Sequence, residues 1–586
     1  MKFLDRYVEH EAAFPWQFVD CDRICHLRLR SKESIAKINV IFGDPFYFAN
    51  SDTDTPLLEQ KEALKVASIG NTTYYAIDIP MKTHKLRYHF DIVFSDGVNA
   101  LLTSSGVIEP VTEQQLRPFF VPYVFEDNHY CAPSWSDHTI WYEIFPDRFS
   151  DEKDEDMAMF VPERTNHYRG TINGIRKHIP YLVDLDVTGI YLTPIFAGAS
   201  NHRYDTTDYA QIDPMLGTEC DFAALVAELH EAGLRIMLDG VYNHCAWDHP
   251  FWQDVVQKGE KSPYFEWFDV SDVEGLHLRD LAFFKQVEKD VLPFECFAFA
   301  PDMPKWNTNN HLVIEYLTEQ AAYWTREYSI DAWRLDVPDE VSERFHRVFR
   351  SKMRAINPNI YIVGEIWQDG DLWLSEGWFD ATMNYPLYFA VRDFALIKKD
   401  SLEAFYRRLQ TFYVSLPTQI QQRQLSFCSN HDLPRPLFLA NNDDHAVQKA
   451  FFITAVFGGA LSLYYGDELG MTGGSDPANR GAMRWDTLSL EKPWRRFMKA
   501  LVQFKRHFVA DAVLTSLFLH SSGVLEGTLT SDVGILRVFL TENGKNATLP
   551  ISSLCVFGKA VKISNGYSIE GFAAFFEKAK DISQDL

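Results

Sequence analysis

Eight short apolar segments alternate with helical stretches between about residue 137 and residue 507. The stretches Phe222 to Gly233 and Val447 to Gly459 place apolar residues at helical spacing. Eight strand–helix alternations over about 370 residues are typical of a (β/α)8 TIM barrel, which is an α/β fold. The eight expected strands begin at Thr139, Gly189, Arg235, Asp331, Asn359, Trp378, Gln424 and Ala460.

The regions on either side of this alternation are β-rich. Four segments near the N-terminus alternate apolar and polar residues and are separated by turns, which predicts a small sandwich. The gap after the third barrel strand is too long for a loop and predicts an inserted subdomain. We therefore expect an N-terminal β-sandwich at 1–122, the barrel at 123–507 with an insertion at about 245–310, and a C-terminal β domain at 508–586.

The composition excludes some classes of function. The formal net charge is -25, whereas nucleic acids and anionic membranes are bound by clustered Lys and Arg, so we expect neither partner. A neutral substrate is compatible with this charge. The eight cysteines lack paired CxxC spacing, the first residues hold no apolar segment of signal-peptide length, and no run of about 18 apolar residues occurs. These features predict a cytoplasmic protein.

The fourth expected strand, DAWRLDVPDE from Asp331 to Glu340, holds an informative pair of charged residues. Arg334 and Asp336 are two residues apart, and residues i and i+2 of a strand point to the same face. A guanidinium beside a carboxylate favours the ionised acid. Taken alone, a structural ion pair and a functional pair are equally good interpretations.

Other expected strands also end in polar residues, at the edge where barrel active sites lie. These residues are Asp239, Asn243 and His244 after strand three, Glu365 and Trp367 after strand five, and Asn430, His431 and Asp432 after strand seven. Two carboxylates flanking a pocket are the basis of glycoside hydrolysis, one as nucleophile and one as proton donor. The pattern therefore favours a functional site over a set of strand caps.

The surroundings of each acid indicate its role. Asp336 lies beside Arg334 and fits an ionised nucleophile. Glu365 follows the apolar run IYIVG, and apolar surroundings raise a carboxyl pKa, as a proton donor requires. Asp432 would stabilise a cationic transition state. His431, like His244, would donate hydrogen bonds to sugar hydroxyls, although a histidine at a strand end is more often structural.

Several motifs resemble those of the α-amylase family of glycoside hydrolases, in the same order along the chain. They are DGVYNH at Asp239, WRLDV at Trp333, GEIW at Gly364 and SNHD at Ser429. Three further segments resemble the neopullulanase, cyclomaltodextrinase and maltogenic amylase group: MPKWNT at Met303, TPIFAGASNHRYDTTDY at Thr193 and YYGDELGMTGGSDPANR at Tyr464. The resemblance spans the whole chain.

The resemblance implies a role for each of eleven residues. Asp336 is the expected nucleophile, Glu365 the acid/base and Asp432 the transition-state stabiliser. The expected substrate-binding residues are Tyr204, His244, Arg334, His431, Asp476, Arg480, Trp367 and Phe297, although ordinary packing explains Trp367 and Phe297 equally well. The resemblance further implies α-glucan oligosaccharides or cyclodextrins as substrates and a homodimer in which one N-terminal sandwich overhangs the partner's cleft. The chemistry requires no organic cofactor.

Three departures from the group bear on function. Pro338 and Asp339 replace an Ala-Asn pair after the nucleophile motif, on the acceptor side of the cleft. The segment SDEKDEDM from Ser150, with Thr171 in place of an expected aspartate, fits a solvated charged loop better than a calcium site. Trp306 replaces a smaller residue and is expected to narrow or reshape the cleft.

Two other functions stay open at this point. A transglycosylase or an α-glucosidase could use the same scaffold and the same three acids. A non-catalytic sugar-binding protein would be favoured by loss of the nucleophile or the acid, and both residues are present. The main expectation is therefore retaining hydrolysis of α-1,4-glucosidic bonds, with sugar transfer as a second outcome of the same intermediate.

Overall fold

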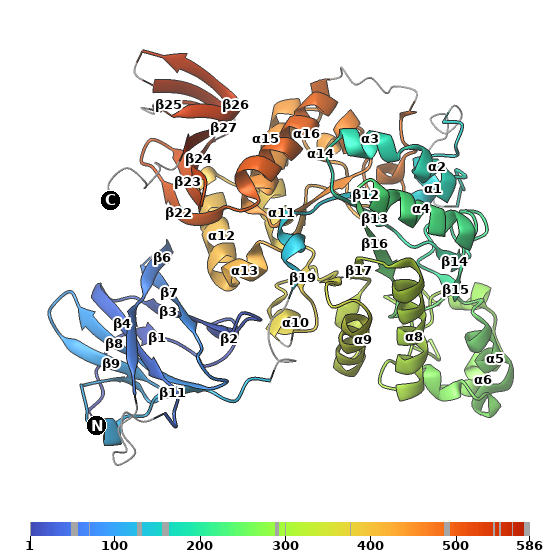
Figure 1. Cartoon of the computed structure of the whole chain (residues 1–586). Helices are drawn as coiled ribbons and strands as arrows, with labels where there is room; N and C mark the ends of the chain where they lie inside the picture. Colours follow the sequence, from blue (N-terminus) through green and yellow to red (C-terminus); the bar gives the residue numbers. More distant parts are fainter. Residues whose placement is uncertain are drawn as a thin grey trace.

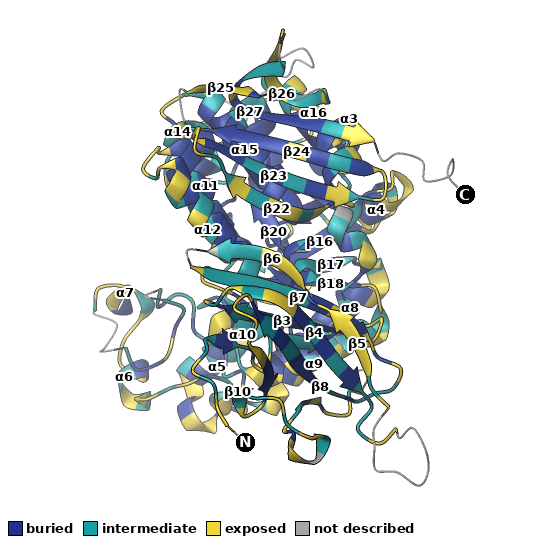
Figure 2. Cartoon of the chain, turned by 90° about the vertical axis from the view of Figure 1, so that its left-hand side faces the viewer, coloured by how far each residue is buried: buried dark blue, intermediate teal, exposed yellow. Residues whose placement is uncertain are grey.

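The computed structural model describes residues 2–47, 57–69, 71–125, 132–154, 163, 165–287, 292–298, 300–375, 377–485, 493–542, 545–549, 553–564 and 566–578. Figure 1 shows three bodies: an antiparallel N-terminal sandwich, a central barrel surrounded by helices, and a C-terminal antiparallel sheet. The sandwich and the C-terminal sheet lie on the same side of the barrel, and Figure 2 looks onto that side. The predicted fold class is confirmed.

The central barrel forms from the eight expected apolar segments. Its strands are β12 (Ile140–Ile144), β13 (Gly189–Leu192), β16 (Arg235–Gly240), β17 (Ala332–Leu335), β18 (Tyr361–Gly364), β19 (Ala381–Thr382), β20 (Leu425–Phe427) and β21 (Ala460–Tyr464). All neighbouring strands are parallel, and an isolated parallel bridge between Met383 and Leu425 joins the two end strands. The surrounding helices include α4 (Glu219–Glu231), α8 (His311–Tyr328), α9 (Glu343–Ile356), α12 (Leu402–Ser415), α15 (Asp444–Phe457) and α16 (Pro493–Phe504).

Alternate residues of each barrel strand pack into different cores. Trp141, Met237 and Ala332 belong to the cluster that fills the barrel, whereas their neighbours Tyr142 and Leu238 belong to the cluster between the strands and the helices. This is the alternation expected when one face of a strand points into a closed barrel. A polar residue two positions after an inward apolar residue therefore also points inward, at the C-terminal end of its strand.

The two β bodies are antiparallel, as expected, and the sandwich contains more strands than the four segments expected from the sequence. The sandwich pairs one sheet of β1 (Val8–Glu9), β2 (Gln17–Val19), β3 (Ile24–Ser31), β6 (Leu64–Ile69) and β7 (Thr72–Pro80) with a second of β4 (Ile35–Gly43), β5 (Glu59–Glu62), β8 (Leu86–Phe94), β9 (Asn99–Thr103), β10 (Gly106–Ile108) and β11 (Phe119–Val121). The C-terminal sheet contains β22 (Val513–Leu519), β23 (Val524–Ser531), β24 (Gly534–Thr541), β25 (Asn546–Leu549), β26 (Leu554–Ile563) and β27 (Gly566–Lys578).

The segment inserted after β16 packs its aromatic residues into the core that lies between the barrel strands and the helices. It contains the helices α5 (Pro250–Lys258) and α6 (Val273–His277), at the lower right of Figure 1, and α7 (Leu281–Phe284), which Figure 2 labels. Trp306 is only 1% exposed, stacks on Phe268 at 4.6 Å, and donates from Nε1 to Tyr209 Oη (3.1 Å). The buried indole therefore does not narrow the cleft directly, and it joins the insertion to Tyr209 outside it. The expectation that Trp306 reshapes the cleft stays a prediction.

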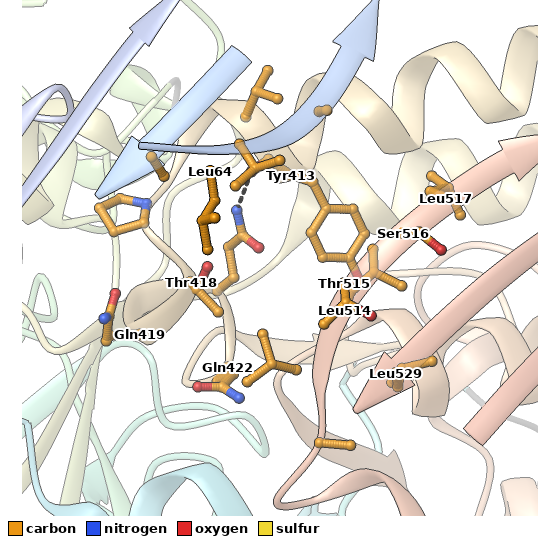
Figure 3. Close-up of a pocket in the computed structure, with 18 of the residues that line it drawn as sticks. Leu64, Tyr413, Thr418, Gln419, Gln422, Leu514, Thr515, Ser516, Leu517 and Leu529 are labelled. Atoms are coloured by element: carbon orange, nitrogen blue, oxygen red, sulfur yellow. Dashed lines mark hydrogen bonds between the residues drawn. The ribbon is translucent and has the colours of Figure 1, made fainter. Parts of the chain in front are cut away.

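A cavity of about 570 Å³ lies where the three bodies meet. Leu64 of β6, Tyr413 of α12, and Leu514 and Leu529 of the C-terminal sheet surround it (Figure 3). Gly458, just before β21, also lines it, so the cavity lies at the N-terminal ends of the barrel strands. Barrel active sites lie at the opposite ends. The cavity therefore belongs to the packing of the three bodies.

His26 of β3 is a buried charged group beside this cavity. Its Nε2 lies 2.9 Å from Asp20 Oδ2, its Nδ1 lies 2.7 Å from Asp78 Oδ1, and the Gln419 amide of the barrel lies 3.2 Å from Nδ1. Burial lowers the pKa of His26, but the two aspartates outweigh burial and raise it above its usual value. Protonated His26 is therefore stabilised by two aspartates of the sandwich, at the face where the sandwich meets the barrel.

We predict that His26→Gln removes a pH-dependent part of the stability. Because the folded pKa is raised, the contribution of His26 is fully present below about pH 6.5 and is lost as the pH rises through the folded pKa. The variant should lose about 1 to 2 kcal/mol of unfolding free energy at pH 6 and less at higher pH, measured by urea unfolding. His507→Gln, at an exposed histidine bonded only to a backbone carbonyl, is the control. An equal loss at all pH values would contradict the prediction.

Candidate active site

Arg334 lies at the centre of a buried cluster of charged side chains at the C-terminal end of β17, and is 0% exposed. Its Nη1 donates to Asp239 Oδ1 (2.8 Å) and Oδ2 (3.0 Å), and to Asp336 Oδ1 (2.8 Å). Its Nη2 lies 2.8 Å from Glu365 Oε2, as an ion pair without hydrogen-bond alignment. The structure therefore brings Arg334, Asp336 and Glu365 together around one guanidinium.

The carboxyl groups of Asp336 and Glu365 both have raised pKa values, which opposes the loss of a proton from both groups at once. Burial raises the pKa of each carboxyl group, and the charge of Arg334 opposes this at both. The charge of Glu365 raises the pKa of Asp336 further. At both carboxyl groups, burial therefore raises the pKa by more than the charge of Arg334 lowers it. Of these two carboxyl groups, only Asp336 accepts an aligned hydrogen bond from Arg334, which favours its ionised form. We therefore assign the proton that the pair shares to Glu365.

A second group of predicted residues follows β20 and β21. His431 Nε2 lies 2.6 Å from Tyr204 Oη and 3.1 Å from Asp432 Oδ2. Arg480 Nη2 donates to Asp432 Oδ1 (3.1 Å), and its Nη1 lies 3.2 Å from Asp476 Oδ1. Tyr204 also donates to Asp239 (2.9 Å), which connects this group to the Arg334 cluster. All five predicted residues therefore belong to one continuous network.

Opposite charges stabilise each other in this second group. Burial alone would raise the pKa of Asp432, but the cations of His431 and Arg480 outweigh it and hold that pKa well below its usual range. Burial lowers the pKa of His431, but Asp432 and then Glu143 outweigh it and raise the pKa to about 10. Asp432 is therefore an anion and His431 a cation at neutral pH.

The remaining predicted residues form two aromatic stacks beside the acids. His244 stacks on Phe297 with ring centroids 4.7 Å apart, and its Nε2 has no hydrogen-bond partner within the described part of the chain. Burial lowers the pKa of His244 to about 3, so its ring is neutral. Trp367 is 41% exposed, stacks on Tyr385 at 4.2 Å, and donates from Nε1 to Glu365 Oε1 (3.2 Å). These rings leave apolar faces and one free ring nitrogen beside the acids.

Comparison with known families shows to which family the chain belongs. The family description "Alpha amylase, catalytic domain" matches residues 143–506, and "Alpha amylase, N-terminal ig-like domain" matches residues 5–125. The chain belongs to the α-amylase family. It is a glycoside hydrolase of that family, as the motifs and the fold predicted.

Named relatives of this α-amylase family chain fall in the expected group. A cyclomaltodextrinase of Geobacillus thermopakistaniensis is 34% identical over 513 residues, which cover 86% of this chain and 84% of that relative. An intracellular maltogenic amylase of Bacillus subtilis is 34% identical over 497 residues, 83% of this chain and 81% of that relative. A solved cyclomaltodextrinase structure has a TM-score of 0.86 at 29% identity, covering 98% of this chain and 100% of the other. No helix among the described residues is long and apolar enough to cross a membrane.

The turn after β17, which holds Pro338 and Asp339, follows the predicted nucleophile Asp336 directly. Val337 has φ 43° and ψ 48°, a left-handed conformation that β-branched residues rarely adopt, and precedes the 3-10 turn Pro338–Glu340. Its N–H donates to Glu365 Oε2 (3.2 Å), and Glu340 accepts from Lys305 Nζ of the insertion (3.2 Å). The turn therefore contacts both the acid and the inserted segment.

Asp154 of the acidic segment from Ser150 is already bonded to neighbouring side chains. Asp154 pairs with Lys177, lies 3.1 Å from His178 Nε2, and accepts from Ser150 Oγ (2.6 Å). Residues 155–157 of this segment lie outside the described residues. Within the described ranges, no three His, Cys, Asp or Glu side chains are grouped as a metal ion would require.

Two members of the site have no role predicted from the sequence. Asp239 is expected only as a polar residue at a strand end, and Glu143 is not among the expected site residues. Both lie two positions beyond an inward apolar residue, Trp141 for Glu143 and Met237 for Asp239. Glu143 is moreover the only charged residue of β12. An inward acid in an apolar strand was therefore an available signal for both.

We predict that Asp239→Asn weakens the fold of the active site. The change weakens the charge-assisted hydrogen bonds of Arg334 to Asp239, which are worth about 1.5 to 3 kcal/mol, while Asp336 and Glu365 still compensate the guanidinium charge. Guanidinium unfolding should show a loss of this size. Glu403→Gln, which breaks the exposed Arg407–Glu403 pair, is the control and should stay close to the parent. An Asp239→Asn protein as stable as the parent would contradict the central role of Asp239.

Proposed function

We propose that this protein hydrolyses α-1,4-glucosidic bonds in cyclomaltodextrins and maltooligosaccharides, and also acts on pullulan and starch, with retention of configuration. The carrying observation is that one buried guanidinium, Arg334, binds both Asp336 and Glu365. Relatives named cyclomaltodextrinase, maltogenic amylase and neopullulanase support α-glucans as the substrate class. A covalent glycosyl-enzyme is the expected intermediate of a retaining pair of carboxylates.

In the first half of the reaction, Asp336 attacks the anomeric carbon while Glu365 gives its proton to the leaving glycosidic oxygen. Asp336 receives the aligned hydrogen bond of Arg334, which favours its ionised form. Glu365 begins protonated because burial and the charge of Asp432 raise its pKa against Arg334. The C–O bond to the leaving group breaks as the bond to Asp336 forms.

In the second half, Glu365 accepts a proton from water, and the water oxygen displaces Asp336 from the anomeric carbon. Positive charge develops on the sugar ring in both transition states. Asp432 is held ionised by His431 and Arg480, so its charge stabilises that cation without a prior loss of a proton. A second sugar in place of the water gives transglycosylation, and the turn after Val337 borders the side where that acceptor enters.

The other network members bind the sugars on either side of the bond. Tyr204 stacks on the sugar before the cleaved bond, and the free Nε2 of His244 hydrogen-bonds there, as the unpartnered buried atom suggests. Asp476 with Arg480 holds the next sugar. Trp367, with its partly exposed indole, packs against the leaving sugar together with Phe297.

We further propose a cytoplasmic homodimer in which one N-terminal sandwich overhangs the partner's cleft and favours short or cyclic substrates. Phe46, Tyr47 and Phe125 of the sandwich are 69%, 61% and 62% exposed, so the sandwich offers large apolar side chains that a partner subunit could cover. The name of the Bacillus subtilis relative, intracellular maltogenic amylase, supports the compartment.

Substitution of the two carboxylates tests the reaction. Asp336→Asn and Glu365→Gln should each lower kcat on β-cyclodextrin by at least about 10⁴-fold, because each removes a group that acts in the transition state. The α-anomer should appear first in NMR spectra of maltotriose hydrolysis. Initial release of the β-anomer would contradict the retaining mechanism.

Product analysis tests the substrate class. Purified enzyme should release maltose from β-cyclodextrin, and slower release is expected from pullulan and starch. Glucose alone would favour an α-glucosidase, and longer oligomers would favour a transglycosylase. The absence of any reducing sugar from all three substrates would reject the proposed function, because the three acids would then serve no hydrolysis.

Sedimentation tests the dimer. A mass near 67.7 kDa at micromolar concentration would contradict it, since that is the mass of one chain. Replacement of Phe46 and Tyr47 by Ser should shift the dimer toward the monomer and lower the preference for β-cyclodextrin over starch. Exposed Val533, on the C-terminal sheet, is the site of a control Val533→Ser substitution.

A further inference from the structure

Glu143 lies under the catalytic network and makes two contacts with a single residue. Its side chain is 1% exposed at the inward face of β12. Its Oε1 accepts from the backbone N–H of His431 (3.1 Å) and lies 2.7 Å from His431 Nδ1. An oxygen that accepts from a backbone N–H presents lone pairs, so the Nδ1 that faces it must carry a hydrogen.

The other ring nitrogen of His431 also faces oxygens that accept. Arg334 and Tyr191 both donate to Asp239 Oδ2, so that oxygen is an acceptor, and Tyr204 must give its single hydroxyl hydrogen to it. Tyr204 Oη, 2.6 Å from His431 Nε2, can then only accept. Asp432 Oδ2, 3.1 Å from the same nitrogen, accepts as well. Nε2 must therefore also carry a hydrogen.

We propose that Glu143 is a positioning residue that fixes the hydrogen of His431 on Nδ1 and keeps the ring doubly protonated, so that Nε2, which faces Tyr204 and Asp432 in the free protein, keeps a hydrogen to donate at the substrate site. The proposal rests on the proposed function, because it assigns His431 a donor role toward sugar hydroxyls. A neutral ring with its hydrogen fixed on Nδ1 would have only a lone pair at Nε2. Because Glu143 holds one hydrogen on Nδ1, Nε2 can donate only when the His431 ring carries a second hydrogen and is positively charged.

Several charged or titratable groups face His431 from the elements packed around it. They are Glu143 of β12, Tyr204 before β15 (Thr206–Ile212), Asp432 of the same loop, Glu365 after β18, and Arg480, whose Nε donates to the His431 carbonyl (2.8 Å). Asp432 and Glu143 are the anions in direct contact. Burial lowers the pKa of His431, whereas these two raise it to about 10, in agreement with the hydrogen-bond geometry.

Glu143→Gln tests the charge without changing the shape. The amide oxygen still accepts from the backbone N–H and from Nδ1–H, but it carries no charge. The pKa of His431 should then fall, and the proton should leave from Nε2. In [15N]histidine spectra recorded against pH, we expect the Nε2 hydrogen of His431 to be lost roughly two pH units lower in this variant than in the parent, because one of the two anions in contact with the ring has been removed.

Glu468→Gln is a matched control. Glu468 is 0% exposed and accepts from the hydroxyls of Tyr142 (2.7 Å) and Tyr181 (2.6 Å), away from His431. In Glu468→Gln, the His431 ring should lose its proton at the same pH as in the parent. A purely structural role of Glu143 would lower activity but leave the titration of His431 unchanged, and a Glu143→Gln protein whose His431 ring titrates as in the parent would overturn the proposal.

A second measurement avoids dependence on the folding of the variant. In the [15N]histidine spectrum of the parent enzyme, assigned with His431→Gln, both ring nitrogens of His431 should be protonated at pH 8. A neutral His431 at that pH would overturn the proposal even if hydrolysis is normal. An enzyme without hydrolytic activity but with a doubly protonated His431 would instead reject only the proposed function, so the two failures are distinguishable.

Discussion

The buried guanidinium of Arg334 is the interaction on which the catalytic end of the barrel depends. Transfer of one ion from water to such a site costs several kcal/mol, which only well-placed partners offset. Arg334 has three carboxylate partners from three consecutive strands, Asp239, Asp336 and Glu365. Because one cation faces three acids, negative charge is in excess there. This excess, together with burial, leaves a proton on the pair formed by Asp336 and Glu365.

The opposite side of the site has a different charge balance. Asp432 faces two cations, His431 and Arg480, and Glu143 supplies the additional anion beneath the histidine. One carboxyl group of the site is thus kept protonated while another stays ionised at the same pH. Retaining glycoside hydrolysis needs this division between an acid and an anion. This division between a protonated and an ionised carboxyl group depends on where the cations lie, and not only on how far each carboxyl group is buried.

Much of this arrangement could be predicted from the sequence, because apolar strand patterns and the acids that end them are local features. The eight strands, the sandwich and the Arg334–Asp336 pair followed from spacing alone. The contact of Glu143 with His431 joins the first and seventh strands, which are 288 residues apart. Such a contact depends on the closure of the barrel, and the sequence does not show it. The burial of Trp306 likewise depended on how the insertion folds back on itself.

The alternation of inward and outward residues along β17 also constrains how such a chain can evolve. A one-residue insertion within the strand would exchange Arg334 and Asp336 with Trp333 and Leu335, since the side-chain period of a strand is two. Charges would then enter the layer beneath the helices, and an indole would occupy the catalytic mouth. Deletions and insertions are therefore confined to connections such as the one between β16 and β17. New substrate preferences in this scaffold must arise in those connections, while the strands can change only by substitution.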